Sequence, residues 1–163
     1  HCPSSNLILA SGISPVVDLR AAGVHVGLGV DGSSSADSAS LWLEARQAML
    51  LAKLRNGVAA GTARMALEIA TLGGAACLGR TGELGVIEPG AAGDVAVWSL
   101  TGPSFAGALA DPVEAWLRCG PTGARDTIVQ GRPVVRGGVL VSSRLDQMLV
   151  AHDGMARRIQ QLG

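Results

Sequence analysis

The residue whose chemistry stands out is Asp31, which follows a short, valine-rich apolar run at residues 24–30. Such a run predicts a strand buried on both faces, as in a parallel sheet covered by helices. Asp31 is followed by Gly32 and a serine-rich loop at residues 33–38. Because parallel α/β enzymes place catalytic groups at the C-terminal ends of strands, Asp31 is a candidate anionic ligand or catalytic group. The alternative is an Asp-Gly turn whose carboxylate only caps the next segment.

Two hydroxyl-rich segments, residues 4–6 and 33–35, could supply polar partners for Asp31. If both leave the same edge of a parallel sheet, they face one pocket. Ordinary loop chemistry remains the alternative for most of these side chains.

Histidines and cysteines are too few and too scattered to form a complete metal site by spacing alone. His25 lies inside the predicted strand, His152 lies on a C-terminal helix, and His1 is the polar candidate near the start of the chain. The sequence has no His-x-His, His-Glu-x-x-His or Cys-x-x-Cys pattern, so it does not predict a complete zinc site. Cys2 is a conceivable ligand or nucleophile, but no base lies near it in the sequence.

Composition describes a globular chain with a neutral surface. Hydrophobic residues make up 48% of the 163 residues and charged residues 16%, and 13 basic residues balance 13 acidic ones. This balance gives no electrostatic footprint for nucleic acid or an anionic membrane, and no apolar run approaches the length of a membrane span. Three cysteines, an odd number far apart, argue against a disulfide framework and favour the cytoplasm.

Helical periodicity predicts two helices that flank the candidate strand. The first begins with Ser14 as N-cap and Pro15 in the first turn, and it ends at Gly23. The second covers residues 39–55 and ends at Gly57. Its apolar stripe is Trp42, Ala45, Met49 and Ala52, while the charged residues expected to point elsewhere are Glu44, Arg46 and Lys53.

Glycine and proline mark the remaining boundaries. Residues 1–12 are predicted to be a loop, and a further helix capped by Thr62 is predicted to break at Gly73-Gly74. The residues of that helix expected to face inward are Met65, Ile69 and Leu72. Later elements are a strand at 94–98, a helix at 112–118, strands within 127–141 with hairpin signals at Gln130-Gly131 and Gly137-Gly138, and an amphipathic helix at 143–162. We therefore expect an α/β part at residues 1–80 and a β-rich part at residues 81–163, closed by a helix.

A string of motifs runs in order through nearly the whole chain. They are His1-Cys-Pro-x-Ser-Asn6, Leu9-x-Ser-Gly12-Ile-x-Pro15, Ala22-Gly-Val, Gly27-Leu-Gly-Val-Asp-Gly32 with Ser33 and Ser35, Glu44-x-Arg46, Ala70-Thr-x-Gly73-Gly-Ala, Leu78-Gly79, Gly82-x-Leu84-Gly85, Ile87-x-Pro89-Gly, Ala92-Gly-Asp94 and Cys119-Gly-Pro121. Together they resemble the C-terminal part of aminohydrolases of the amidohydrolase superfamily. They are specific for this branch of the superfamily and less specific for the substrate, although Cys119-Gly-Pro121 favours the enzymes that deaminate 8-oxoguanine.

The resemblance implies the C-terminal portion of a (β/α)8 barrel plus part of a small β-sandwich-like domain. Asp31 would then be both the metal ligand at the end of strand eight and the proton carrier, with one divalent ion, Zn²⁺ or alternatively Fe²⁺. The other ligands would lie upstream of His1, so this chain alone would be inactive. His1 would be a pocket-edge residue rather than a ligand, and Asn6 and Ser33 are further candidates for the pocket edge.

The implied reaction is hydrolytic deamination of an aromatic heterocycle, 8-oxoguanine first, with guanine, hydroxyatrazine or an adenosine derivative as alternatives. A small heterocyclic molecule is therefore the expected partner, without nucleic acid or membrane, and the long C-terminal helix would suit a homo-oligomer interface. The alternative of another class is a non-catalytic binding or assembly domain. A His-x-His far upstream of His1 would favour the enzyme, and a start codon just before His1 would favour the binding domain.

Overall fold

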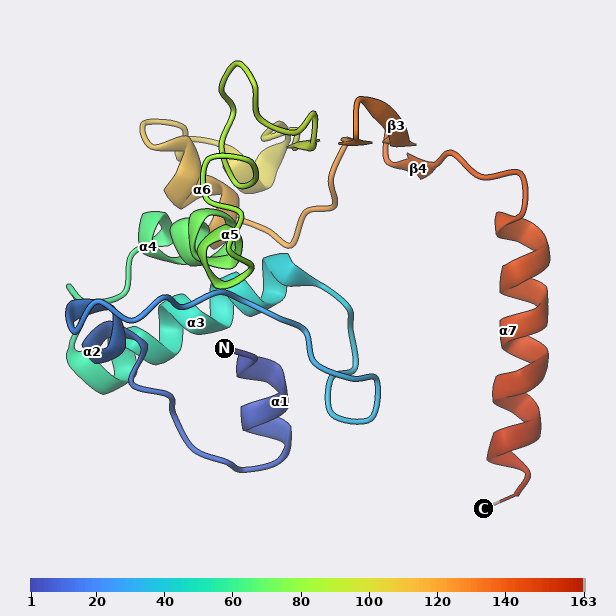
Figure 1. Cartoon of the computed structure of the whole chain (residues 1–163). Helices are drawn as coiled ribbons and strands as arrows, with labels where there is room; N and C mark the ends of the chain where they lie inside the picture. Colours follow the sequence, from blue (N-terminus) through green and yellow to red (C-terminus); the bar gives the residue numbers. More distant parts are fainter. Residues whose placement is uncertain (163) are drawn as a thin grey trace. The chain divides into compact units, whose positions relative to one another are not determined.

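The computed structural model describes residues 1–162, which form two compact units (Figure 1). The helical unit comprises residues 1–92 and 99–122, and the sheet unit comprises residues 93–98 and the chain from residue 123 onward. The chain enters the sheet unit at residues 93–98 and returns to the helical unit at residues 99–122. This division differs from a single boundary after residue 80. The fold combines helices with a small antiparallel sheet.

The helical unit is built around α3 (Leu41–Asn56), which contacts five other helical segments. Ser40 caps its N-terminus by accepting a hydrogen bond from the Leu43 backbone nitrogen, and Gly57 ends it with φ of +93°. The C-terminal boundary at Gly57 agrees with the prediction, whereas the helix begins two residues later than predicted. The remaining elements of this unit are α1 (Pro3–Ile8), α2 (Val16–Ala21), α4 (Ala63–Glu68), the π turn η1 (Ile69–Gly73), α5 (Gly74–Cys77), the 3-10 turn η2 (Pro103–Phe105) and α6 (Pro112–Arg118).

Small side chains dominate the buried face of α3 and let its neighbours approach closely. Glu44 lies on this face with no exposed surface, so the expectation that it points elsewhere is wrong. Position 44 lies four residues before Ala48 and eight before Ala52, so it shares their side of the helix. The buried residues of α3 are Glu44, Ala45, Ala48, Met49 and Ala52.

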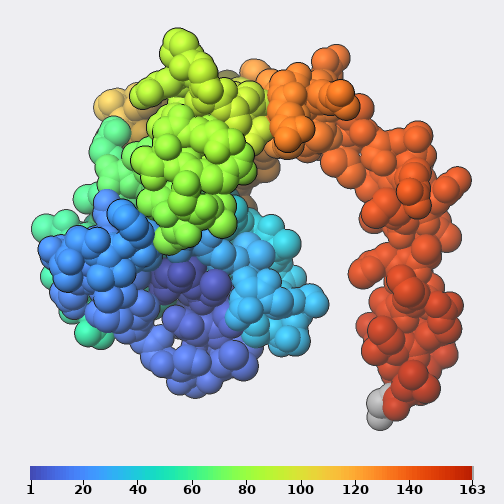
Figure 2. Space-filling model, viewed as in Figure 1, coloured from blue at the N-terminus to red at the C-terminus, as the bar shows by residue number. Residues whose placement is uncertain are grey.

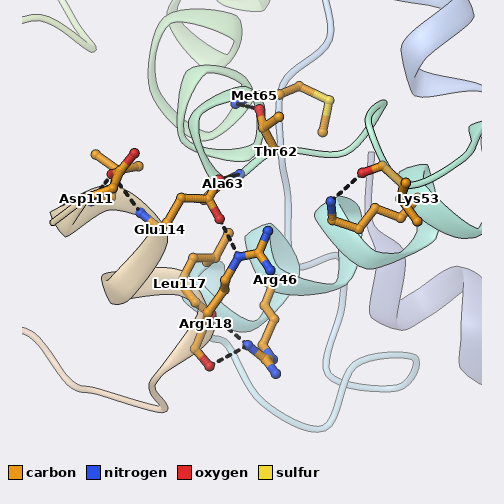
Figure 3. A network of polar contacts seen from close by, with 11 residues as sticks. Arg46, Lys53, Thr62, Ala63, Met65, Asp111, Glu114, Leu117 and Arg118 are labelled. Carbon is orange, nitrogen blue, oxygen red and sulfur yellow. Dashed lines mark hydrogen bonds and ion pairs between the residues drawn. The ribbon is translucent and has the colours of Figure 1, made fainter. Parts of the chain in front are cut away.

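Polar contacts tie α6 to α3 and α4 (Figure 3). Arg46 Nη1 donates to the carbonyl oxygens of Leu117 at 2.8 Å and Arg118 at 3.0 Å, at the C-terminus of α6. Glu114 accepts a hydrogen bond from the Ala63 backbone nitrogen at 3.0 Å, at the N-terminus of α4, and pairs with Arg118. A cation at a helix C-terminus and a carboxylate at a helix N-terminus both match the helix dipole. These contacts therefore anchor residues 112–118 on the helical unit.

The helical path from residue 63 to residue 77 is continuous, so the predicted break at Gly73-Gly74 is wrong. Both glycines have helical φ angles of −63° and −59°, and the π turn carries the chain through this point. A Cβ at Gly73 would lie 2.0 Å from the Val26 carbonyl oxygen, so glycine here permits a close approach rather than a bend. The predicted Thr62 cap is present, whereas Leu72, expected inside, is 46% exposed.

Two boundaries near the start of the chain also differ from the predictions. Residues 3–8 form the short helix α1 instead of a loop, with Pro3 in its first turn, where a missing N–H costs nothing. Pro15, not Ser14, is the N-cap of α2, and no side chain caps that helix. Gly23 ends α2 with φ of +78°, as predicted.

The apolar run at residues 24–30 is not a regular strand. Its backbone meets His1, whose nitrogen donates to the Gly27 carbonyl oxygen at 2.8 Å and whose carbonyl oxygen accepts from the Gly29 nitrogen at 3.0 Å. This exchange is the pattern of a parallel ladder. One flanking residue cannot make a strand, because a strand needs hydrogen-bonded neighbours along its length. The predicted strand is therefore reduced to a single parallel step within residues 1–162.

The sheet unit contains an antiparallel sheet in the order β1-β2-β3-β4. Its strands are β1 (Val95–Val97), β2 (Asp126–Val129), β3 (Arg132–Arg136) and β4 (Val139–Leu140). The turns at Gln130-Gly131 and Gly137-Gly138 have positive φ angles at both central residues, as two-residue hairpins of type I′ require. The strands and both hairpins agree with the predictions.

The last helix, α7 (Leu145–Gln160), has no buried residue. Its apolar side chains include Met148, Leu149, Met155 and Ile159, all at least half exposed. The predicted amphipathic helix is therefore present. None of the helices in the described part of the chain combines the length and apolar character that crossing a membrane requires.

Candidate active site

Asp31 ends the glycine-rich segment, is exposed to solvent and has φ of +58°. Few residues other than glycine adopt this left-handed conformation, and aspartate is among those that tolerate it. The conformation turns the chain sharply into the loop at residues 32–36, where the nitrogens of Ser35 and Ala36 both donate to the Gly32 carbonyl oxygen at 3.1 Å.

Two serine hydroxyls from distant and local segments hold the Asp31 carboxylate. Ser5 Oγ donates to Oδ2 at 2.6 Å, and Ser35 Oγ donates to the same oxygen at 3.2 Å. The Gly32 backbone nitrogen donates to Oδ1 at 2.8 Å. The structure thus brings the two hydroxyl-rich segments together at Asp31, as the sequence suggested they could be. In Figure 2 the dark blue surface of α1 adjoins the lighter blue surface of the loop after Asp31.

These donors favour the ionised carboxylate. The Ser5 hydroxyl has the largest effect in lowering the pKa of Asp31 below its usual value, followed by the Gly32 N–H and the Ser35 hydroxyl. Asp31 is therefore an anion at neutral pH. A carboxylate offers about four lone-pair positions, and three are occupied here, which leaves one free on Oδ1. That free position suits a single bond to a cation.

Ser5 owes its position to the first turn of α1. Its side chain belongs to a residue only 4% exposed, and the Asn6 nitrogen closes the turn by donating to the Cys2 carbonyl oxygen at 3.0 Å. The sequence pointed to residues 4–6 as a group and did not single out Ser5. Its separation from Asp31 by 26 positions hides the pairing from any local pattern.

The other predicted site residues lie around this centre without a hydrogen bond to the carboxylate among the contacts described. His1 is half-buried and pairs through its backbone with residues 27 and 29, while Asn6 is half-buried and Ser33 is exposed. Cys2 Sγ would lie 3.2 Å from a Cβ at Gly29, so it packs against the glycine-rich segment. The pocket-edge roles of His1, Asn6 and Ser33 stay predictions.

The donors present at Asp31 fit a divalent metal only in part. An ionised, exposed carboxylate oxygen is a suitable ligand for zinc or iron(II). Within residues 1–162, however, no three histidine, cysteine, aspartate or glutamate side chains gather where they could hold a metal ion. The described chain therefore offers one ligand and needs others to complete a site.

Comparison with known proteins supplies the family. The model of the amidohydrolase family matches residues 1–134. The chain is 43% identical over 156 residues to 8-oxoguanine deaminase of Pseudomonas aeruginosa, a match that covers 96% of this chain and 34% of that protein. It is 36% identical over 160 residues to 5-methylthioadenosine/S-adenosylhomocysteine deaminase of Desulforudis audaxviator, with 98% and 37% covered.

A solved structure agrees with these matches. An adenosine deaminase from Xanthomonas campestris, determined with bound zinc, superposes with a TM-score of 0.89 at 30% identity and covers 99% of this chain and 37% of that one. These similarities place the chain among hydrolases. More particularly, the chain belongs to the amidohydrolase family. It spans about a third of the length of the curated relatives it matches.

Proposed function

We propose that this chain is the C-terminal part of a metal-dependent aminohydrolase that removes an amino group from an aromatic heterocycle and releases ammonia. Residues 1–80 would be the last βα units of a (β/α)8 barrel, and residues 81–163 would belong to a composite β domain with its closing helix. The observation that carries the proposal is the Asp31 carboxylate, exposed and held by two serine hydroxyls in a chain of the amidohydrolase family.

Asp31 would have two roles. Oδ1 would contribute one bond to a divalent ion, zinc or alternatively iron(II), whose other ligands would be histidines outside this chain. When bound, such an ion supplies Lewis-acid chemistry and lowers the pKa of water toward neutrality. Asp31 would accept the proton of the attacking water and pass it toward the leaving amine. Ser5 and Ser35 would fix the carboxylate through Oδ2, so that Oδ1 keeps one orientation.

The reaction would be addition of water to an amidine-like ring carbon, followed by loss of ammonia from the tetrahedral intermediate. The preferred substrate is 8-oxoguanine, because the relative of that name is 43% identical and aligns with 96% of this chain. Adenosine derivatives are the second candidate, supported by the relative from Desulforudis audaxviator and the zinc-containing adenosine deaminase. Guanine and hydroxyatrazine remain further alternatives.

Ammonia release from the purified complete protein tests this proposal. The panel is 8-oxoguanine, guanine, adenosine, S-adenosylhomocysteine and hydroxyatrazine, each at micromolar concentration with zinc or iron(II). Because hydroxyatrazine carries only alkylamino groups, its reaction is followed by release of the alkylamine. Release is expected to be fastest with 8-oxoguanine. Faster release from an adenosine derivative would replace the preferred substrate. No release from any of the five would favour a non-catalytic binding or assembly domain.

A further inference from the structure

Glu44 is a buried acid that the proposed chemistry does not use. It lies on α3 with no exposed surface, and its Oε2 accepts a hydrogen bond from the Ser4 backbone nitrogen at 2.9 Å. Its Oε1 has no hydrogen-bond partner within residues 1–162. Burying a carboxylate with half of its acceptors unpaired is costly, and a well-packed apolar side chain of similar size would stabilise the fold at least as well. Stability alone therefore does not account for an acid at this position.

The hydrogen bond from Ser4 to Glu44 indicates the structural role of this acid. Ser4 precedes Ser5, the strongest donor to Asp31, and both lie in the first turn of α1. The Ser4 hydroxyl adds a second tie to α3, because Ser4 Oγ donates to Gln47 Oε1 at 3.0 Å. Through these two contacts, α3 fixes the backbone and side chain of the residue just before Ser5. Ser5 is itself 4% exposed, so its hydroxyl has little freedom once Ser4 is held.

We propose that Glu44 is a positioning residue that holds the first turn of α1 on α3, so that the Ser5 hydroxyl stays directed at Asp31. The chain of contacts runs from Glu44 to the Ser4 nitrogen, and from the adjoining Ser5 hydroxyl to Asp31 Oδ2 at 2.6 Å. Glu44 does not contact the carboxylate that it positions. This inference rests on the proposed function, since it needs a reaction in which the orientation of Asp31 matters.

A double-mutant cycle in the complete, metal-loaded protein tests the inference. Glu44→Met removes the acceptor at similar volume, Ser5→Ala removes the donor to Asp31, and Glu44→Gln keeps one oxygen to accept from Ser4. We expect Glu44→Met to lower kcat about tenfold with KM nearly unchanged, and to speed zinc loss to a chelator by a similar factor. Glu44→Gln should recover most of both losses.

The effect of Glu44→Met should nearly vanish in the Ser5→Ala background, because residues that act through one another are not additive. Met49→Ala is the matched control, since Met49 is a buried residue of the same helix and is not among the described hydrogen-bond partners of Ser4, which are Glu44 and Gln47. Its effect should be the same in both backgrounds. If Glu44→Met proves unstable, Gln47→Met removes the second tie from a half-buried side chain and should show the same loss of effect beside Ser5→Ala.

Additive losses for Glu44→Met and Ser5→Ala would overturn the inference, as would equal losses for Glu44→Met and Glu44→Gln. The proposed function fails separately, when the wild-type protein releases no ammonia or when Asp31→Asn keeps the wild-type rate. The chelator measurement follows zinc retention directly and does not depend on which substrate is used.

Discussion

Adjacent glycines in the helical run offer a sharp test of how the Asp31 segment is positioned. Gly73 and Gly74 both have helical backbone angles. A Cβ at Gly73 would lie 2.0 Å from the Val26 carbonyl oxygen, whereas a Cβ at Gly74 would meet no atom within 4 Å beyond its chain neighbours and the adjoining helix backbone in the described chain. Ordinary contact begins near 3.4 Å, so Gly73→Ala must push the segment at residues 24–30 away by more than 1 Å.

The magnitudes follow from this geometry. Overpacking of this kind costs about 1–3 kcal/mol, and a displacement of about 1 Å at a catalytic group costs about 100-fold in rate. Gly74→Ala instead gains helix propensity of about 0.5–1 kcal/mol. We therefore expect Gly73→Ala to be about 2 kcal/mol or more less stable than Gly74→Ala, and about 100-fold slower.

Both variants of the complete protein are compared by chemical denaturation and by ammonia release. Gly74→Ala is the matched control, because it makes the same chemical change one residue further along the helix. Equal stability and equal kcat for the two variants would refute the close approach between Gly73 and Val26 and the account of how Asp31 is positioned.

Three further predictions concern α6 and its anchors. Asp111→Ala removes the N-cap that accepts from the nitrogens of Val113 and Glu114, and should lower the unfolding free energy by about 1 kcal/mol in urea denaturation. Arg46→Met leaves the carbonyls of Leu117 and Arg118 without their donor, and should cost about 1–2 kcal/mol in the same assay; an unchanged midpoint would count against this contact. Burial opposes ionisation of Glu114, but the Ala63 N–H and Arg118 outweigh it and lower its pKa below the usual 4.5. Its contribution is therefore present above pH 4.5 and lost as the pH falls through the lowered value, so Glu114→Gln should flatten the loss of stability between pH 5 and pH 3 by less than about 1 kcal/mol.

Elements with local signals could be predicted from the sequence. The C-terminal end of α3 depends on Gly57, and the hairpin at Gln130-Gly131 depends on positive φ angles that a short sequence signal predicts. These features involve residues a few positions apart. These features can therefore be predicted without knowledge of the rest of the fold.

Features that depend on distant contacts could not be predicted in this way. The segment at residues 24–30 has the composition of a strand, but a strand requires neighbouring strands. Within residues 1–162 its backbone bonds to His1 in one parallel step and to the helical residues Leu19 and Ile69, none of which lies in a strand. Gly73 has the local signal of a helix breaker, because glycine is a poor helix former. Its close approach to Val26 joins segments that are far apart in the chain and so gives no local signal. The charge of Glu44 predicts an exposed side chain, but its position on the apolar side of α3 buries it.

The candidate site shows the same division. The position of Asp31 after an apolar run makes it a candidate functional carboxylate from local sequence alone. The identity of its strongest donor, Ser5, depends on a contact across 26 positions that composition and periodicity do not encode.

Replacement of Asp31 by asparagine in the complete protein, with ammonia release, zinc content and circular dichroism followed together, tests the central claim most directly. The account predicts an unchanged circular dichroism spectrum, weakened zinc retention and a kcat lower by about a thousandfold. The reason is that the neutral asparagine amide can neither accept the proton nor offer the cation a negatively charged ligand. A variant that deaminates substrate at the wild-type rate with full zinc content would show that Asp31 does no more than cap its own turn.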